Sequence, residues 1–140
     1  MKLHVPYDGS PQSDKALDTA VHLAQGMGGA IVVVNVVPDL CLMSEEIPAG
    51  DCDAVSRALD MNGSVALHRA GEKLKGSGVE VETVMKSGRI VDSILDVAQE
   101  RSIDCIVIGA HGRHKALRML LGSVSSKVAE LSSCNVLIVK

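Results

Sequence analysis

The chain has 140 residues, a length typical of one domain built around one hydrophobic core, and we expect a single domain over residues 1–140. Hydrophobic residues make up 46% of it and charged residues 22%, an ordinary globular composition that argues against a disordered or membrane-embedded chain. The formal net charge of −3 and the single aromatic residue, Tyr7, leave neither a basic surface nor stacking platforms, so we expect no nucleic-acid partner.

The apolar runs are all shorter than the roughly 20 residues needed to span a bilayer, so we expect no contact with a membrane. The first residues also lack the long apolar stretch of a signal peptide, and we therefore expect a cytoplasmic protein. The four cysteines are scattered, with no Cys-x-x-Cys pair. Cys105 and Cys134 adjoin apolar runs typical of core strands, and we expect these two to be buried thiols.

The first half of the chain begins with a mostly apolar run over residues 3–7, which predicts a strand. A helix should follow, because Ser10 can cap its free amides and apolar residues recur at helical spacing up to Gly28-Gly29. Residues 31–37 are apolar and rich in β-branched side chains, which is typical of a central strand covered on both faces. Residues 38–51 carry two prolines and no period, and we interpret them as a loop.

The second half begins with a long helix expected over residues 52–75, although Gly63 weakens its middle. Residues 79–84 alternate between apolar and charged side chains, which predicts a half-exposed strand at an edge of the sheet. The same patterns predict four further elements: a helix over 90–98, a strand over 105–108, a helix after Gly122-Ser123 and a strand over 136–139.

Strands and helices therefore alternate along the whole chain. This order predicts a mainly parallel five-stranded sheet with right-handed crossovers and helices on both faces, a three-layer α/β/α sandwich. In sheets of this class, ligands bind at the carboxyl ends of the strands, where the strand order reverses.

A glycine motif follows the fourth predicted strand. Gly109, Gly112, Gly122 and Ser123 have the spacing G-x2-G-x9-G-S and end at the start of the last predicted helix. Without Cβ atoms, Gly109 and Gly112 would let the backbone bend through positive φ and bring its amides close to a phosphate. The amides and dipole of the helix start would attract the same anion, and the hydroxyls of Ser123 and Ser125 can donate to it. The alternative is that these glycines serve turn geometry alone.

Asp8 ends the first strand, the expected neighbour of the fourth. Its carboxylate can face a ribose or a bound divalent cation, or it can simply cap the first helix. His111 and His114 lie in the glycine loop beside Arg113 and Lys115. These four side chains can contact phosphate or a metal ion, or they can serve solubility only.

Two segments resemble the universal stress protein family: Val5-Pro6-Tyr7-Asp8-Gly9-Ser10 is similar to its opening motif, and residues 109–123 are similar to its nucleotide motif. The resemblance covers the whole chain and implies a Rossmann-like, adenine nucleotide alpha hydrolase-like sheet in the order 3-2-1-4-5. Members that keep the glycine motif bind ATP, and this chain keeps every glycine and the serine. Tyr7 stands where the family commonly has a smaller residue, and His4 replaces an apolar position, so either can narrow the adenine pocket or tune affinity.

The resemblance also assigns residues to the two halves of a nucleotide. On the adenosine side it implies Pro6, Tyr7, Asp8, Val36, Ile108 and Gly109. On the phosphate side it implies Gly112, Gly122, Ser123, Val124 and Ser125, to which we add His111 and Arg113 from the loop. Mg²⁺ would come with ATP and lie near Asp8. The family usually pairs into dimers through the last strand, and Val136 to Val139 form an apolar edge that fits a homodimer.

These expectations favour a nucleotide-dependent module of the stress response that binds ATP and hydrolyses it slowly at most. The alternatives are a slow ATPase or nucleotide-dependent transferase, and a dimeric scaffold without a nucleotide. An efficient ATPase is disfavoured because the chain has no Walker G-x4-G-K-[ST] lysine. A flavin or phosphoacceptor domain is disfavoured as well, because the chain has a single aromatic residue and no acidic cluster after the first strand.

Overall fold

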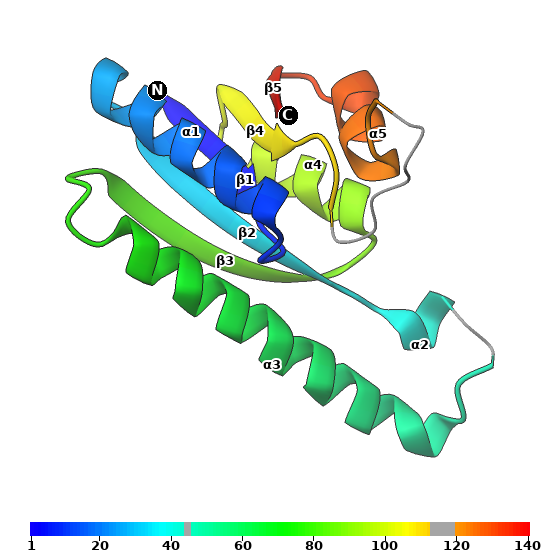
Figure 1. Ribbon diagram of the computed structural model, residues 1–140. Helices are drawn as coiled ribbons and strands as arrows, with labels where there is room; N and C mark the ends of the chain where they lie inside the picture. Colours follow the sequence, from blue (N-terminus) through cyan, green and yellow to red (C-terminus); the bar gives the residue numbers. More distant parts are fainter. Residues whose placement is uncertain (44–45, 113–119) are drawn as a thin grey trace.

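Five parallel strands form one sheet in the computed structural model, which describes residues 1–43, 46–112 and 120–140 (Figure 1). The strand order is β3-β2-β1-β4-β5, which confirms the predicted order. The strands are β1 (Lys2–Pro6), β2 (Ala30–Pro38), β3 (Glu80–Gly88), β4 (Cys105–Gly109) and β5 (Asn135–Val139). The helices are α1 (Pro11–Met27), α2 (Leu40–Met43), α3 (Ala49–Leu74), α4 (Ile90–Glu100) and α5 (Ser123–Leu131).

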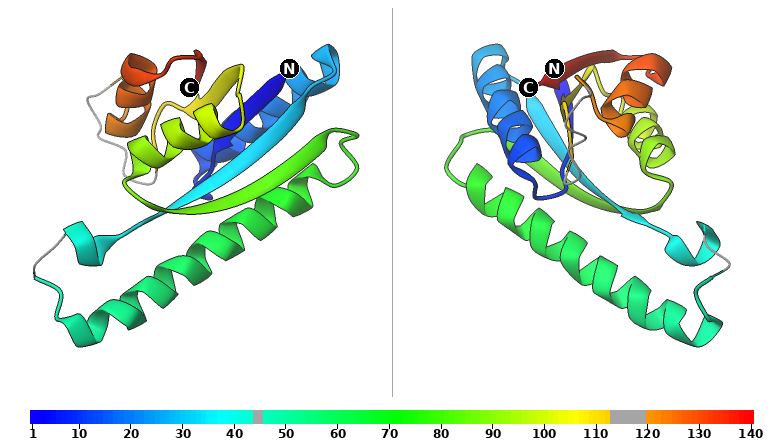
Figure 2. Two further views of the ribbon diagram at one scale, coloured as in Figure 1. Left: turned by 180° about the vertical axis from the view of Figure 1, so that it is seen from behind. Right: turned by 45° about the vertical axis from the view of Figure 1, so that its right-hand side comes forward.

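The sheet lies between two layers of helices, as predicted, and each layer closes its own apolar core (Figure 2). On one face, Leu3 and Val5 of β1 pack with small and apolar side chains of α1 and α3. On the other face, Val32 and Val34 of β2 pack with α4 and α5. Successive strand residues point to opposite faces, so β1 and β2 supply both cores and are buried throughout their middles.

Local capping explains where α1 begins and ends. The Ser10 side chain accepts a hydrogen bond from the Ser13 amide at 3.2 Å, as predicted for its cap, and Pro11 follows at the first helical position. At the other end, Gly28 adopts φ 68°, a left-handed conformation that glycine reaches without a Cβ clash. These ends direct α1 back along the sheet toward the start of β2.

The predicted loop over residues 38–51 is wrong in two respects. Leu40–Met43 form the short helix α2, and α3 begins at Ala49, three residues before its expected start. The prolines that suggested a loop flank these helices: Pro38 ends β2, and Pro48 directly precedes α3, where a missing N–H costs no helical hydrogen bond. A disulfide between Cys41 and Cys52 joins the two helices, a pairing that the sequence did not indicate.

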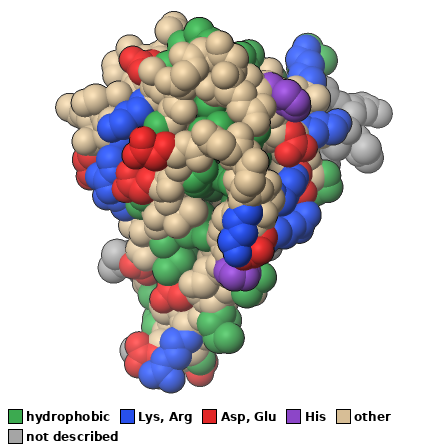
Figure 3. Space-filling model, turned by 90° about the vertical axis from the view of Figure 1, so that its left-hand side faces the viewer, with side chains coloured by type: hydrophobic (Ala, Val, Ile, Leu, Met, Phe, Trp, Pro, Cys, Tyr) green, Lys and Arg blue, Asp and Glu red, His purple; other side chains and the backbone are tan. Residues whose placement is uncertain are grey.

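The surface carries both charge signs. Figure 3 shows one side of the molecule, on which Lys and Arg side chains lie interspersed with Asp and Glu. In the part of the chain that the structure describes, no helix is long and apolar enough to cross a bilayer.

Gly63, which the sequence suggested would weaken α3, lies where this helix packs against β2. A Cβ built on it would come within 2.6 Å of Asn35 Oδ1 and 3.1 Å of Val37 Cγ2. Asn35 cannot move away cheaply, because it is buried and its Nδ2 donates to the Tyr7 carbonyl at 2.8 Å. Gly63 therefore permits close packing of α3 on β2.

We expect Gly63→Ala to lower the free energy of unfolding by about 2 kcal/mol, because the added methyl must displace Asn35 or push α3 off the sheet. Gly71→Ala, in the same helix, is the matched control. No atom lies within 4 Å of a Cβ at Gly71, so the better helix propensity of alanine should raise stability by up to about 1 kcal/mol. Urea denaturation followed by circular dichroism measures both, and equal effects of the two substitutions would contradict this account of Gly63.

Candidate functional site

The strand order reverses between β1 and β4. From β1 the chain passes to α1 on one face of the sheet, and from β4 it passes to α5 on the other face. The two connections therefore diverge at the carboxyl edge, which is the usual ligand position in such folds. The candidate site is built at this point from the ends of β1, β2 and β4 and the start of α5.

Three of the predicted adenosine-side residues share one face of the sheet. Pro6 pairs with Val34 across β1 and β2, and His4 pairs with both Val32 and Ile106. Because facing side chains recur every second residue, Pro6, Val36 and Ile108 lie on the same side, the one covered by α4 and α5. The register therefore brings these apolar residues together beside the edge.

The Tyr7 side chain lies on the opposite face, packed among α1 and α3 and only 2% exposed. Its hydroxyl donates to Asp14 Oδ1 at 2.7 Å, and Arg69 and Lys73 of α3 form ion pairs with the same carboxylate. Burial first, and then the bond to Asp14, raise the pKa of Tyr7 above its ordinary value. The structure thus separates this side chain from the other predicted residues and gives it a role in joining α1 to α3.

Opposing effects act on the pKa of Asp14. Burial raises it, but the hydrogen bonds from Tyr7 and Lys73 and the charges of Lys73 and Arg69 together outweigh burial, so the net pKa is lowered from 3.8. Asp14 therefore stays ionised at neutral pH and anchors α3. No role in a nucleotide site follows from this cluster.

Asp8 lies in the connection from β1 to α1, beside Gly112 of the connection from β4 to α5. Its Oδ1 accepts a hydrogen bond from the Ser10 amide at 2.9 Å, which closes a turn around Gly9, whose φ is 79°. Its Oδ2 faces Gly112, where a Cβ would come within 3.1 Å. Ser10, and not Asp8, is the cap of α1. The Asp8 carboxylate instead closes the turn and lies against Gly112.

The glycines of the motif act through missing side chains and not through positive φ, so that expectation is wrong. Neither Gly109 nor Gly112 has φ in the left-handed range, and Gly122 has φ −72°. A Cβ on Gly109 would lie 2.9 Å from the Gln12 carbonyl oxygen, and one on Gly122 would lie 3.1 Å from that of Ala110. Gly109 therefore permits contact between β4 and the start of α1, and Gly122 permits contact between α5 and the end of β4.

The Ala110 carbonyl ties the two ends of the glycine loop together. It accepts hydrogen bonds from the Gly122 amide at 2.6 Å and from Ser125 Oγ at 2.8 Å, while the Ala110 amide donates to Val139 of β5 at 2.7 Å. The buried Ser125 hydroxyl thus fixes α5 to β4, whereas Ser123 is exposed at the helix start. Gly122 supplies no side-chain cap, and within the described residues no side chain accepts from the first amides of α5.

Two buried polar atoms near this edge have no hydrogen-bond partner among the described residues: Nδ1 of His111 and Oε1 of Gln12. His111 directly follows Ala110, and Gln12 is the residue whose backbone packs on Gly109. Unpaired buried polar atoms are costly, so these two favour a polar ligand at the edge. Arg113, His114 and Lys115 lie outside the described residues. Among the rest, no three His, Cys, Asp or Glu side chains gather as a metal site would require.

Comparison with known proteins decides the family. A family model described as the universal stress protein family matches residues 1–140. The chain is 35% identical to the universal stress protein YxiE of Bacillus subtilis, over 99% of this chain and 98% of that protein. The chain belongs to the universal stress protein family.

Solved universal stress proteins share its fold. The structure of the universal stress protein UspA from Lactobacillus plantarum superposes with a TM-score of 0.88 at 26% identity and covers 100% of this chain and 97% of that one. A universal stress protein solved in complex with cAMP superposes with a TM-score of 0.75 at 28% identity, and covers 100% of this chain and 97% of that chain. These likenesses confirm the predicted Rossmann-like α/β architecture.

In this universal stress protein, the structure brings most of the described predicted residues to one edge. Pro6, Val36 and Ile108 form an apolar side, and Asp8, Gly112, Gly122 and Ser123 line the polar side, with Val124 half-buried behind them. Sequence reasoning missed Gln12, because its approach to Gly109 is a contact between distant segments that no sequence pattern indicates. The expected buried thiols, Cys105 and Cys134, are free but only half-buried.

Proposed function

We propose that this universal stress protein binds an adenine nucleotide, ATP in the first place, at the carboxyl edge of β1 and β4. The proposal rests chiefly on the hydrogen bond from the Gly122 amide to the Ala110 carbonyl, which holds the start of α5 against the end of β4. Near this bond lie two glycines without side chains, Gly112 and Gly122, the first amides of α5, and the unpartnered Nδ1 of His111. The universal stress protein solved with cAMP supports an adenine nucleotide as the ligand class.

Each group has a physical task in this proposal. Pro6, Val36 and Ile108 would bury the adenosine side against an apolar surface. The amides of Ser123 and Val124, with the Ser123 hydroxyl, would donate to phosphate oxygens, while Ser125 keeps α5 in position through Ala110. His111, and Arg113 from outside the described residues, would add donors on the same side.

Asp8 would face the ribose or share a divalent cation with the phosphates, because its carboxylate lies against Gly112. A bound Mg²⁺ would supply charge neutralisation of the phosphates. Since Asp8 Oδ1 already accepts from the Ser10 amide, its orientation is set before any ligand arrives. This preorganisation favours ligand binding. Slow turnover is expected because the sequence has no Walker lysine to assist transfer of a phosphoryl group.

The protein would act as a nucleotide-dependent module of the stress response, with hydrolysis slow at most. We further propose a homodimer through β5, an edge strand of the sheet on which Leu137 is 38% exposed. The cytoplasmic location stays a prediction from the sequence.

Calorimetric titration with ATP and MgCl2 tests the proposal. Wild-type protein should bind saturably, and the double variant Gly122→Val, Ser123→Ala should lose at least about tenfold in affinity, because valine fills the space beside Ala110 and a donor is removed. Gly71→Ala, in α3, is the control and should bind as wild type does. Wild-type protein that binds no ATP would contradict the proposal and favour a dimeric scaffold. Turnover well above about 1 per second would contradict the slow-hydrolysis part.

A further inference from the structure

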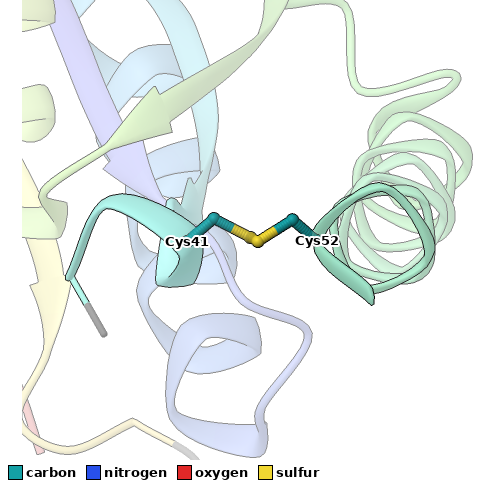
Figure 4. Close-up of a disulfide and its surroundings, with 2 residues drawn as sticks. All are labelled: Cys41 and Cys52. Carbon is teal, nitrogen blue, oxygen red and sulfur yellow. A yellow bond between two sulfur atoms is a disulfide. The ribbon is translucent and has the colours of Figure 1, made fainter. Parts of the chain in front are cut away.

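The disulfide joins α2 to the first turns of α3. Cys41 and Cys52 are 11 residues apart in sequence, and their Cα atoms lie 5.8 Å apart, within the normal range for a disulfide. Figure 4 shows the two side chains pointing toward one another across the space between the helices. Both cysteines are half-buried, so neither is sealed in a core.

This bond closes a projection that we call the arm, residues 38–41 and 46–62. Figure 1 shows α2 and the first half of α3 extending together past the end of the sheet, and the lower end of the molecule in Figure 3 is correspondingly narrow. The buried apolar side chains that the structure describes in α3 all lie in its second half: Ala66, Ala70 and Leu74. Every described side chain from 46 to 62 is exposed or half-buried, so the described arm has no core of its own to hold it.

We propose that Cys41 and Cys52 are a reversible thiol–disulfide switch, which fixes the arm when oxidised and releases it when reduced. The reductant is a small thiol, RSH. Its thiolate attacks one Sγ, the disulfide bond breaks, and the other Sγ leaves as a thiolate that takes up a proton. A second RSH then releases RSSR, so two RSH are oxidised as two cysteine thiols form. The reverse exchange with RSSR restores the disulfide.

The other two cysteines differ in ways that restrict the switch to this pair. Cys105 packs against the core on the α1 and α3 side of the sheet, and Cys134 packs against the core on the other side. Burial also raises the pKa of the Cys105 thiol, which makes it a poorer nucleophile at neutral pH. The arm itself begins at Pro38, two residues beyond Val36, so it leaves the sheet at the same edge as the candidate site. The inference of a switch does not rest on the proposed nucleotide binding.

Hydrogen exchange in oxidised and reduced protein tests this inference. The protein is equilibrated with reduced and oxidised glutathione in varied ratio, thiols are counted by alkylation and mass spectrometry, and amide exchange is then measured in both end states. We expect the Cys41–Cys52 bond to form and break without denaturant. Amides at residues 50–60 should exchange at least about tenfold faster after reduction, while those of β1 and β4 stay unchanged.

Two variants serve as controls. Cys41→Ser with Cys52→Ser should exchange like reduced wild type in both buffers, and Cys105→Ser with Cys134→Ser should keep the full response. The inference is overturned if Cys41 and Cys52 alkylate equally in both buffers, if the bond reduces only in denaturant, or if arm exchange is the same in both states. Because the readouts involve no nucleotide, failure of this switch is distinguishable from failure of nucleotide binding.

Discussion

Between pH 6.5 and pH 4 the protein is expected to lose about 3 kcal/mol of its free energy of unfolding through one buried histidine, His4. His4 is fully buried in β1, where burial lowers its pKa from 6.5 to about 4 and the hydrogen bond between Nδ1 and the Val32 carbonyl offsets this only in part. Since a carbonyl only accepts, Nδ1 carries the proton of the neutral ring. The magnitude follows because each pH unit between the unfolded and folded pKa values of His4 corresponds to about 1.4 kcal/mol.

The sign follows from proton uptake. In this pH window the unfolded chain binds a proton at His4 and the folded chain does not, so lowering the pH favours unfolding. Above pH 6.5 both states are neutral at this ring, and the contribution vanishes. Asp14, whose pKa is lowered from 3.8, contributes stability that is lost only below that value, so the two groups act in separate windows.

Urea denaturation at several pH values measures this effect. His4→Leu should remove most of the slope between pH 6.5 and pH 4, because an apolar side chain of similar size takes up no proton. His22→Gln, at an exposed position of α1, is the matched control and should keep the slope. If wild type and His4→Leu lose stability in parallel over this range, His4 is not the group responsible.

Gly109→Ala is expected to lower the free energy of unfolding by about 3 kcal/mol, the upper end of the usual range for overpacking. The added Cβ would lie within 3.0 Å of Gln12 at its carbonyl oxygen, carbonyl carbon and Cβ. Backbone atoms in the first turn of α1 cannot give way as the end of a flexible side chain can. The first glycine of the motif therefore has a packing role, in addition to any role in ligand binding.

Gly26→Ala is the control for this substitution. It lies in α1 with no atom within 4 Å of a built Cβ, so alanine should stabilise the helix by about 0.5 to 1 kcal/mol. Thermal and urea unfolding of both variants give the comparison. A Gly109→Ala protein as stable as wild type would show that β4 and α1 are not packed as closely as the structure indicates.

The fold could be predicted from the sequence because its signals are local. Short apolar runs, one alternating pattern and helical spacing mark nine of the ten elements that the structure describes, and alternation of strand and helix implies the parallel sheet. The edge position of β3 followed from its alternating charges, and the Ser10 cap from side-chain chemistry. The missed element, α2, is a single turn of helix, too short to show a period.

The candidate site was predictable only in outline. The motif and Asp8 predicted a site at the carboxyl ends of the strands, but what each residue contacts depends on how distant segments approach one another. The Tyr7 side chain faces α1 and α3, as the odd-numbered residues Leu3 and Val5 of β1 do. Predicting this would have required knowing which face of the sheet each helix covers. Likewise, the closeness of Gly109 to Gln12 and of Cys41 to Cys52 is a distance between segments that no local pattern encodes.

An adenine nucleotide is proposed to bind at the carboxyl edge between β1 and β4. The most direct test is an NMR titration of isotope-labelled protein with ATP and MgCl2, which reports the position of binding amide by amide. We predict saturable shifts at Asp8, at Gly109 to Gly112 and at Gly122 to Ser125. The structure also has an open groove between α3 and β3, lined by residues that include Leu67, Thr83 and Met85. Shifts confined to that groove, or no shifts at saturating ATP, would contradict the account.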